Sequence, residues 1–216
     1  MAREYYGLQL KELKNQMLLL GSMVEGVIED TVSALVSQDI EKAKEIAAGD
    51  DKVDRLVRQI EEQCYSLLLR QQPVAGDLRE VSAALKMITD MERIGDHGTD
   101  ISELTVLMGK KPYPDEIRMI EEMSKEAMVM LMEAVDAFAQ ADAKKAGAVI
   151  EMDDIVDELF LKIKGAVALS VKTSETDAEQ ELDLLMTAKY FERIGDHATN
   201  IAEWVLFGIT GELPED

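Results

Sequence analysis

The sequence predicts an all-α fold of two tandem, sequence-duplicated antiparallel three-helix bundles, with six long helices. Helix-forming residues such as Ala, Leu, Glu, Lys and Met are abundant, whereas the 216 residues include only four prolines and thirteen glycines. The hexapeptide ERIGDH occurs at 92–97 and again at 192–197, which indicates an internal duplication. No segment shows the period-two alternation of an amphipathic strand.

The opening segment carries the apolar pattern of a helix in an antiparallel bundle or coiled coil. Two interleaved series, each with a spacing of seven, form this seam: Leu10, Met17, Val24 and Thr31, and Leu13, Leu20, Val27 and Ala34. A turn is predicted near Ser37–Asp39, because Asp39 is a good N-cap for the helix that follows.

The second helix is predicted to continue without interruption from Asp39. Its apolar face is formed by Val53, Val57, Ile60, Cys64 and Leu67. It ends near RQQPVAGD, where Pro73 and Gly76 break a helix. Asp77, with Glu80 three residues later, marks the start of a third helix that runs to about Met108. The segment GKKPYPDE (109–116) is the clearest linker.

The second half of the chain repeats this order. Seven residues from Asp39 to Asp54 recur with an offset of 103, and the region around ERIGDH recurs with an offset of 100. A three-residue deletion between the two regions explains the change, and it fits the turn in which SETDA replaces QQPVAGD. We therefore predict one bundle over 1–109 and a second over 110–216, with ERIGDH in the middle of the third helix of each.

The charge balance limits the classes of partner. With 23 basic and 44 acidic side chains, the net charge is −21. So acidic a protein repels nucleic-acid backbones and anionic lipid headgroups, whereas cations and basic protein surfaces remain attractive. Cys64 is the only cysteine, so no disulfide can form within the chain. No signal-peptide pattern and no membrane-spanning apolar run occur, so a soluble cytoplasmic protein without membrane insertion is expected.

The repeated segments place acidic residues on helical stripes. Glu92 and Glu192 continue apolar series, each seven residues after a leucine, and a carboxylate there is costly unless it is paired, ligated or open to water. The first stripe contains Asp50 and Asp54 on one helix and Glu92, Asp96 and Asp100 on the next; the second contains Asp153, Asp157, Glu192, Asp196 and Asn200. Oxygen-only sites of this kind suit Mg, Ca, Mn or Fe, with Zn possible.

Two other interpretations of the stripes remain open. Arg93 and Arg193 could pair with the neighbouring acids and fix the helix register, which would make each hexapeptide a structural clamp. A purely structural coiled-coil adaptor without metal is a further alternative. The recurrence of the stripes in both halves favours cation binding.

The other residues of the hexapeptide have structural explanations. Gly95 and Gly195 lie mid-helix at a cost of about 1 kcal/mol relative to Ala, which indicates close approach of a neighbouring helix. His97 and His197 point away from the acids, so we expect each to be paired within its bundle. The Glu-x-x-His spacing of di-iron bundles is absent, and so is any catalytic constellation, so an enzyme is not expected.

The segments MERIGDHGTDISE (91–103) and FERIGDHATNIAE (191–203) resemble the paired signatures of the PhoU family. QPVAGDLR (72–79) resembles the turn before the third helix of that family's first repeat, and the resemblance covers nearly the whole chain. It implies two similar three-helix bundles side by side, often in a homodimer, in a cytoplasmic protein. The implied function is repression of the phosphate-starvation response by linking the ATPase subunit of the phosphate ABC transporter to a sensor histidine kinase.

The resemblance also implies metal sites. Some members of the family bind iron or zinc clusters through paired acidic motifs. Those motifs correspond here to the two stripes defined above, with Asn200 departing from the pattern as the replacement for a third acid. The alternative to a regulatory role is a carboxylate-bundle protein that binds metal or stores iron.

Overall fold

The computed structural model describes residues 2–49, 51–70, 75–173 and 177–213, and within them the chain is helical and contains no strand. The first bundle consists of α1 (Ala2–Ser37), α2 (Ile40–Ala47), α3 (Asp51–Arg70) and α4 (Ala75–Met108). The second consists of α5 (Ile117–Gln140), α6 (Ala143–Thr173) and α7 (Ala178–Thr210). This arrangement confirms the all-α class and the repeated three-helix layout.

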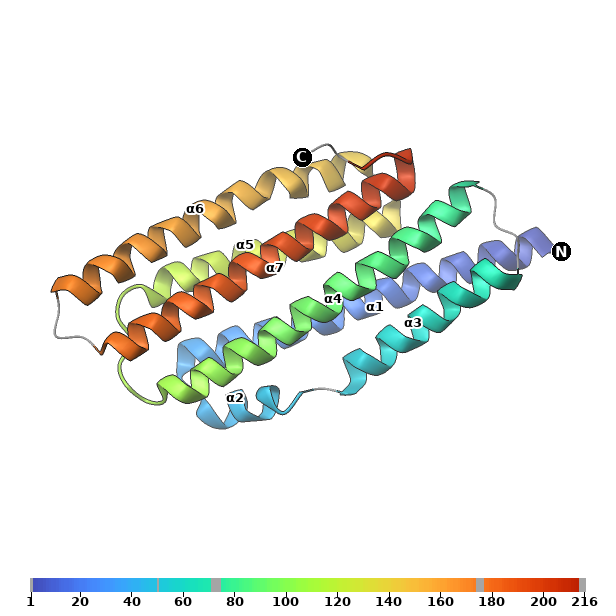
Figure 1. Ribbon diagram of the computed structural model, residues 1–216. Coiled ribbons are helices and arrows are strands. Elements are labelled where there is room, and N and C mark those ends of the chain that lie inside the picture. The colour runs from blue at the N-terminus through green and yellow to red at the C-terminus, as the bar shows by residue number, and fades with distance from the viewer. Residues whose placement is uncertain (1, 50, 71–74, 174–176, 214–216) are drawn as a thin grey trace.

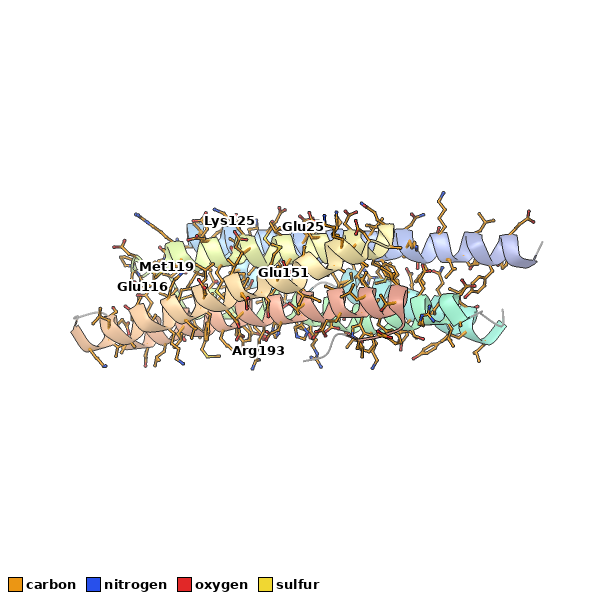
Figure 2. All side chains as sticks on the ribbon, turned by 90° about the horizontal axis from the view of Figure 1, so that it is seen from above. Glu25, Glu116, Met119, Lys125, Glu151 and Arg193 are labelled. Atoms are coloured by element: carbon orange, nitrogen blue, oxygen red, sulfur yellow. The ribbon has the colours of Figure 1, made fainter. Side chains whose placement is uncertain are left out.

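The two bundles lie side by side along one long axis (Figure 1). They contact each other mainly through α4 against α7, and also through α1 against α5. Figure 2 shows the elongated molecule from above, with Lys125 of α5 and Arg193 of α7 on opposite sides. One continuous apolar core runs through both bundles, with members from Leu13 of α1 to Phe191 of α7.

The first turn of each bundle is built alike, as the duplication predicts. Gln38 and Ala141 occupy equivalent positions and both adopt a left-handed backbone, with φ of 54° and 53°. The next residue caps the following helix: the Asp39 carboxylate accepts from the Lys42 amide at 3.1 Å, and the Asp142 carboxylate accepts from the Lys144 and Lys145 amides, each at 3.0 Å. Asp39 is thus confirmed as an N-cap.

The prediction that the second helix of the first bundle is continuous is wrong. The helix is divided into α2 and α3, because Ala48 ends α2 and Gly49 has a φ of +82° that a helix cannot contain. The equivalent positions of the second repeat are Glu151 and Met152, and α6 passes through them without interruption.

Other boundaries are close to the predicted ones. Residues 109–116 separate α4 from α5, which confirms the predicted linker, and α4 begins at Ala75, two residues before the predicted Asp77. The predicted breaks at Pro73 and within 174–176 lie outside the described residues. Among the described helices, none combines the length and the apolar composition needed to cross a membrane.

Candidate functional site

The acid stripe of the first bundle borders a cavity. The break between α2 and α3 leaves a cavity of about 500 Å³ against α4. Its lining includes three of the predicted ligands, Asp54, Glu92 and Asp96, together with the carboxylates of Asp30 and Glu45. Lys42 is the basic residue of the lining, and it is held by Asp30 at 2.7 Å. Of the two remaining predicted ligands of this group, Asp100 is not part of the lining, and Asp50 lies outside the described residues.

The acid stripe of the second bundle joins α6 to α7. The pKa of Asp153 is raised to about 6, first by burial and then by the nearby charges of Asp196, Asp157 and Glu192, although a hydrogen bond with Thr199 opposes the rise. The pKa of Asp196 is raised as well, first by burial and then by Glu192. Oδ1 of Asp153 would also lie 3.4 Å from a Cβ added to Gly195, the residue before Asp196, so α6 and α7 approach each other closely at these acids. The structure therefore brings these four predicted residues into one patch.

The two glycines of the hexapeptide differ in how closely the neighbouring helix approaches. A Cβ added to Gly195 would lie 3.2 Å from Cγ1 of Val156 and 3.4 Å from Oδ1 of Asp153. A Cβ on Gly95 would meet nothing closer than Cγ1 of Val53, at 4.0 Å. The predicted close helix approach is therefore present in the second bundle, and the corresponding contact is looser in the first.

Asp100 and Asn200 take part in a different set of contacts. The Nδ1 atom of His97 lies 3.2 Å from Oδ2 of Asp100. Asn200 Nδ2 donates to Oδ1 of Asp90 at 3.2 Å, and the same oxygen lies 2.8 Å from Nδ1 of His197. These hydrogen bonds are made at the contact between α4 and α7, so Asp100 and Asn200 are engaged there, and their role as metal ligands stays a prediction.

The two histidines meet at this contact between the bundles. Their ring centroids are 5.6 Å apart, and the His97 ring is also 5.3 Å from that of Tyr190. Burial lowers the pKa of His97, and the nearby His197 and Arg193 lower it further, although Asp100 opposes them. His97 pairs within its own helix as expected, whereas His197 pairs with Asp90 of the other bundle, which differs from the prediction.

Sequence reasoning missed Asp90, since it belongs to no repeated motif. Its counterpart in the second repeat is Tyr190, so the duplication gives no signal there. The exchange of an acid for a tyrosine at matched positions is the one indication that a contact between the repeats was asymmetric.

The proposed arginine clamp is reduced to a surface pair in the first bundle. Nη1 of Arg93 lies 3.3 Å from Oδ2 of Asp96, three residues along the same helix, and both side chains are more than half exposed. An exposed pair within one helix contributes at most about 1 kcal/mol and does not join two helices. In the second bundle the cation that meets the stripe is Lys189, which pairs with Glu192.

The chemistry of the acid stripes suits a hard cation, because each stripe offers carboxylate oxygens from two adjacent helices. The Asp153 and Asp196 carboxylates repel each other, and a bound cation would offset that repulsion. Within the described part of the chain, however, no three acidic, histidine or cysteine side chains are arranged to hold one ion. Coordination would therefore require new side-chain rotamers, and in the second bundle the release of Glu192 from Lys189.

Comparisons with known proteins place this architecture in a family. The sequence matches the model of the family described as PhoU domain twice, over residues 17–105 and 120–205. The phosphate-specific transport system accessory protein PhoU homolog of Clostridium acetobutylicum is 34% identical over 213 residues, which cover 98% of this chain and 97% of the relative. The homolog of Rhizobium meliloti is 31% identical over 208 residues, which cover 96% of this chain and 88% of the relative.

Solved structures agree with the sequence comparison. The crystal structure of PhoU from Pseudomonas aeruginosa superposes with a TM-score of 0.90 at 29% identity, and the match covers 96% of this chain and 100% of that one. The phosphate transport system regulatory protein PhoU from Streptococcus pneumoniae gives a TM-score of 0.90 at 27% identity, covering 97% and 99%. The doubled ERIGDH signature, the two matched repeats and the shared fold together show that the chain belongs to the PhoU family.

Proposed function

We propose that this protein is a non-enzymatic, cytoplasmic negative regulator of phosphate uptake and of the phosphate-starvation response. The observation that carries the proposal is the match of nearly the whole chain, both repeats included, to relatives named as accessory proteins of phosphate-specific transport. The architecture supports such a role, since two packed bundles expose long helical faces to partners. Those relatives are named as accessory and regulatory proteins and not as enzymes.

The proposed partners are the ATPase subunit of the phosphate ABC transporter and a sensor histidine kinase. The net charge of −21 favours basic surfaces on these partners, because opposite potentials speed and orient association. A homodimer remains a prediction, and light scattering on the purified chain would measure it.

Capture of the transporter ATPase tests the partnership directly. Immobilised full-length chain should retain the purified ATPase subunit of the same organism, and the retention should weaken as salt is raised, because charge attraction is screened. The ATPase subunit of an unrelated ABC importer serves as the control. Equal retention of both subunits, or of neither, would count against a specific link to phosphate uptake.

We further propose that the two acid patches bind iron or zinc, with Mg, Ca or Mn as alternatives. Asp54, Glu92 and Asp96 would hold the ion in the first bundle, and Asp153, Asp157, Glu192 and Asp196 in the second. A cation there would supply positive charge that compensates the carboxylates. The support is the position of these carboxylates on adjacent helices, beside a cavity in the first bundle and in a partly buried patch in the second.

Metal content measured bundle by bundle tests this second proposal. Protein purified without chelators should carry metal, and Asp157→Asn with Asp196→Asn should remove about half of it, because one patch is lost and the other is retained. The pair Glu151→Gln with Asp154→Asn makes the same change of charge at exposed positions of α6 and should leave the content unchanged. Wild-type protein without metal above background would refute metal binding.

A further inference from the structure

A second cavity lies where the linker between the bundles meets the start of α7. Its volume is about 360 Å³, several times the volume of about 30 Å³ that one water molecule takes up in the liquid. The linker contributes Lys111 and Tyr113 to the lining, and the first turn of α7 with its N-cap contributes Asp177, Gln180 and Glu181. None of these residues belongs to the acid stripes.

Hydrogen bonds from both bundles fix the walls of this cavity. The carbonyl oxygen of Lys111 accepts from Nε2 of Gln38, at 2.6 Å, and from Nε2 of Gln180, at 3.2 Å. Gln38 follows α1 and Gln180 belongs to α7, so the linker is held from two sides. The cavity is therefore a fixed feature of the junction and does not depend on a loose loop.

Glu181 is the unusual residue of the lining. Its side chain is almost fully buried, with a relative exposure of 1%. Its Oε1 atom accepts a hydrogen bond from the Ser170 hydroxyl at 2.5 Å, but Oε2 is buried without a hydrogen-bond partner, and no basic side chain of the described residues lies within ion-pair distance. Natural proteins seldom bury a carboxylate oxygen in this condition, because desolvation of the charge is then uncompensated.

The lysine of the lining is already occupied. The Lys111 ammonium pairs with the Asp177 carboxylate, and the pKa of Asp177 is lowered first by that hydrogen bond and then by the Glu179 amide. The charged residues of the lining are the carboxylates of Asp177 and Glu181 and the ammonium of Lys111. One negative charge therefore has no counter-ion within the lining. The Tyr113 hydroxyl also borders the cavity, and it makes no hydrogen bond of normal geometry with the described residues, although the Gln38 amide lies near it.

We propose that this junction cavity binds a monovalent organic cation, an alkylguanidinium or primary alkylammonium group, with the Glu181 carboxylate as its counter-ion. Such a group donates several hydrogen bonds and carries the single charge that the lining lacks. The cation could be a free small molecule or the side chain of an arginine or lysine in a partner. The inference does not depend on the proposed regulatory role or on metal binding.

Titration of the full chain with butylguanidinium tests the proposal. Calorimetry at constant ionic strength should show binding to the wild type. Butylurea, a neutral molecule of nearly the same shape, should bind at least about tenfold more weakly, because it cannot neutralise Glu181. Equal affinity for the two ligands, or no binding of butylguanidinium, would overturn the proposal and would leave ordered water as the partner of Oε2.

Variants locate the binding at Glu181. Glu181→Gln preserves the shape and removes the charge, so the affinity for butylguanidinium should fall by about tenfold or more. Glu179→Gln makes the same charge change at an exposed position of the same helical turn and should leave the affinity unchanged within about twofold. Wild-type affinity in Glu181→Gln would overturn the assignment. If that variant fails to fold, Glu181→Asp keeps the charge on a shorter side chain and should still bind more weakly than wild type.

A short blocked peptide with one central arginine distinguishes the two sources of the cation. Affinity well above that of butylguanidinium would support a partner side chain as the ligand. Affinity equal to or below it would support a free small molecule. With either source, the chain must bind the cation more tightly than its neutral analogue, and Glu181→Gln must weaken the binding.

Discussion

Asp153 is a carboxylate in an unfavourable electrostatic environment. Its pKa is about 6 in the folded protein, compared with an ordinary value of 3.8, because burial and three neighbouring acids disfavour its ionised form. The unfolded chain releases this proton at lower pH than the folded chain does. The folded state therefore loses stability as the pH rises from about 4 to 6, and the penalty is complete above that range.

Replacement of Asp153 by Asn should accordingly stabilise the metal-free protein at neutral pH. We expect a gain of about 1 kcal/mol at pH 7, smaller than the pKa alone suggests because water screens a partly exposed charge. The gain should shrink as the pH falls and should approach zero below about pH 3, where Asp153 is protonated in both states. Urea denaturation in the presence of a chelator, repeated across this pH range, measures the difference.

Asp154→Asn is the matched control for this measurement. It removes one carboxylate from an exposed position beside Asp153 and should change the free energy of unfolding by less than about 0.5 kcal/mol. A loss of stability in Asp153→Asn at pH 7 would show that the carboxylate is favourably paired, contrary to the repulsion described above.

At the scale of the helices, the two repeats differ in how tightly the second and third helices pack. Gly95→Ala should stabilise the protein by about 0.5–1 kcal/mol, because alanine favours the helix and the added Cβ meets Val53 at ordinary contact distance. Gly195→Ala gains the same helical preference, but its Cβ would press on Val156 at 3.2 Å. Its gain should be smaller or should become a loss.

Thermal or urea unfolding of the two variants provides the comparison, and each acts as the control for the other. Equal stabilisation by both substitutions would contradict the tighter approach of α6 to α7. That outcome would also weaken the explanation of Gly195 as a residue selected for close packing.

Helix-scale features explain where sequence reasoning succeeded. The heptad of α1, the Asp39 cap and the 109–116 linker are local signals, and each predicted its element correctly. The break at Gly49 was missed because a single glycine is common inside helices, and its positive φ is a property of the folded backbone. The second repeat has Met152 at the equivalent position, so comparing the repeats did not indicate a break there.

The acid stripes show why spacing alone was insufficient. Successive residues of a helix turn by about 100°, so Asp100 lies about 80° around the helix from Glu92. That rotation carries Asp100 toward the side of α4 that faces α7, where it lies next to His97 of the same helix, and Asn200 of α7 donates to Asp90 of α4. The sequence alone does not reveal that α4 and α7, the third helices of the two bundles, pack against each other. It therefore could not predict these contacts.

At the scale of the whole molecule, the two repeats form one body with a shared core. The asymmetric contacts of Asp90 and His197 join the bundles, while the acid patches remain on separate helix pairs. The proposed task of the protein is to keep the phosphate-starvation response silent while phosphate is plentiful.

Transcription from a phosphate-starvation promoter, measured in cells that lack this protein and grow in abundant phosphate, tests that task most directly. We expect the promoter to become active in the deletion strain and to be silenced again by the wild-type gene on a plasmid. A promoter that stays as silent in the deletion strain as in the parent would contradict a repressive role.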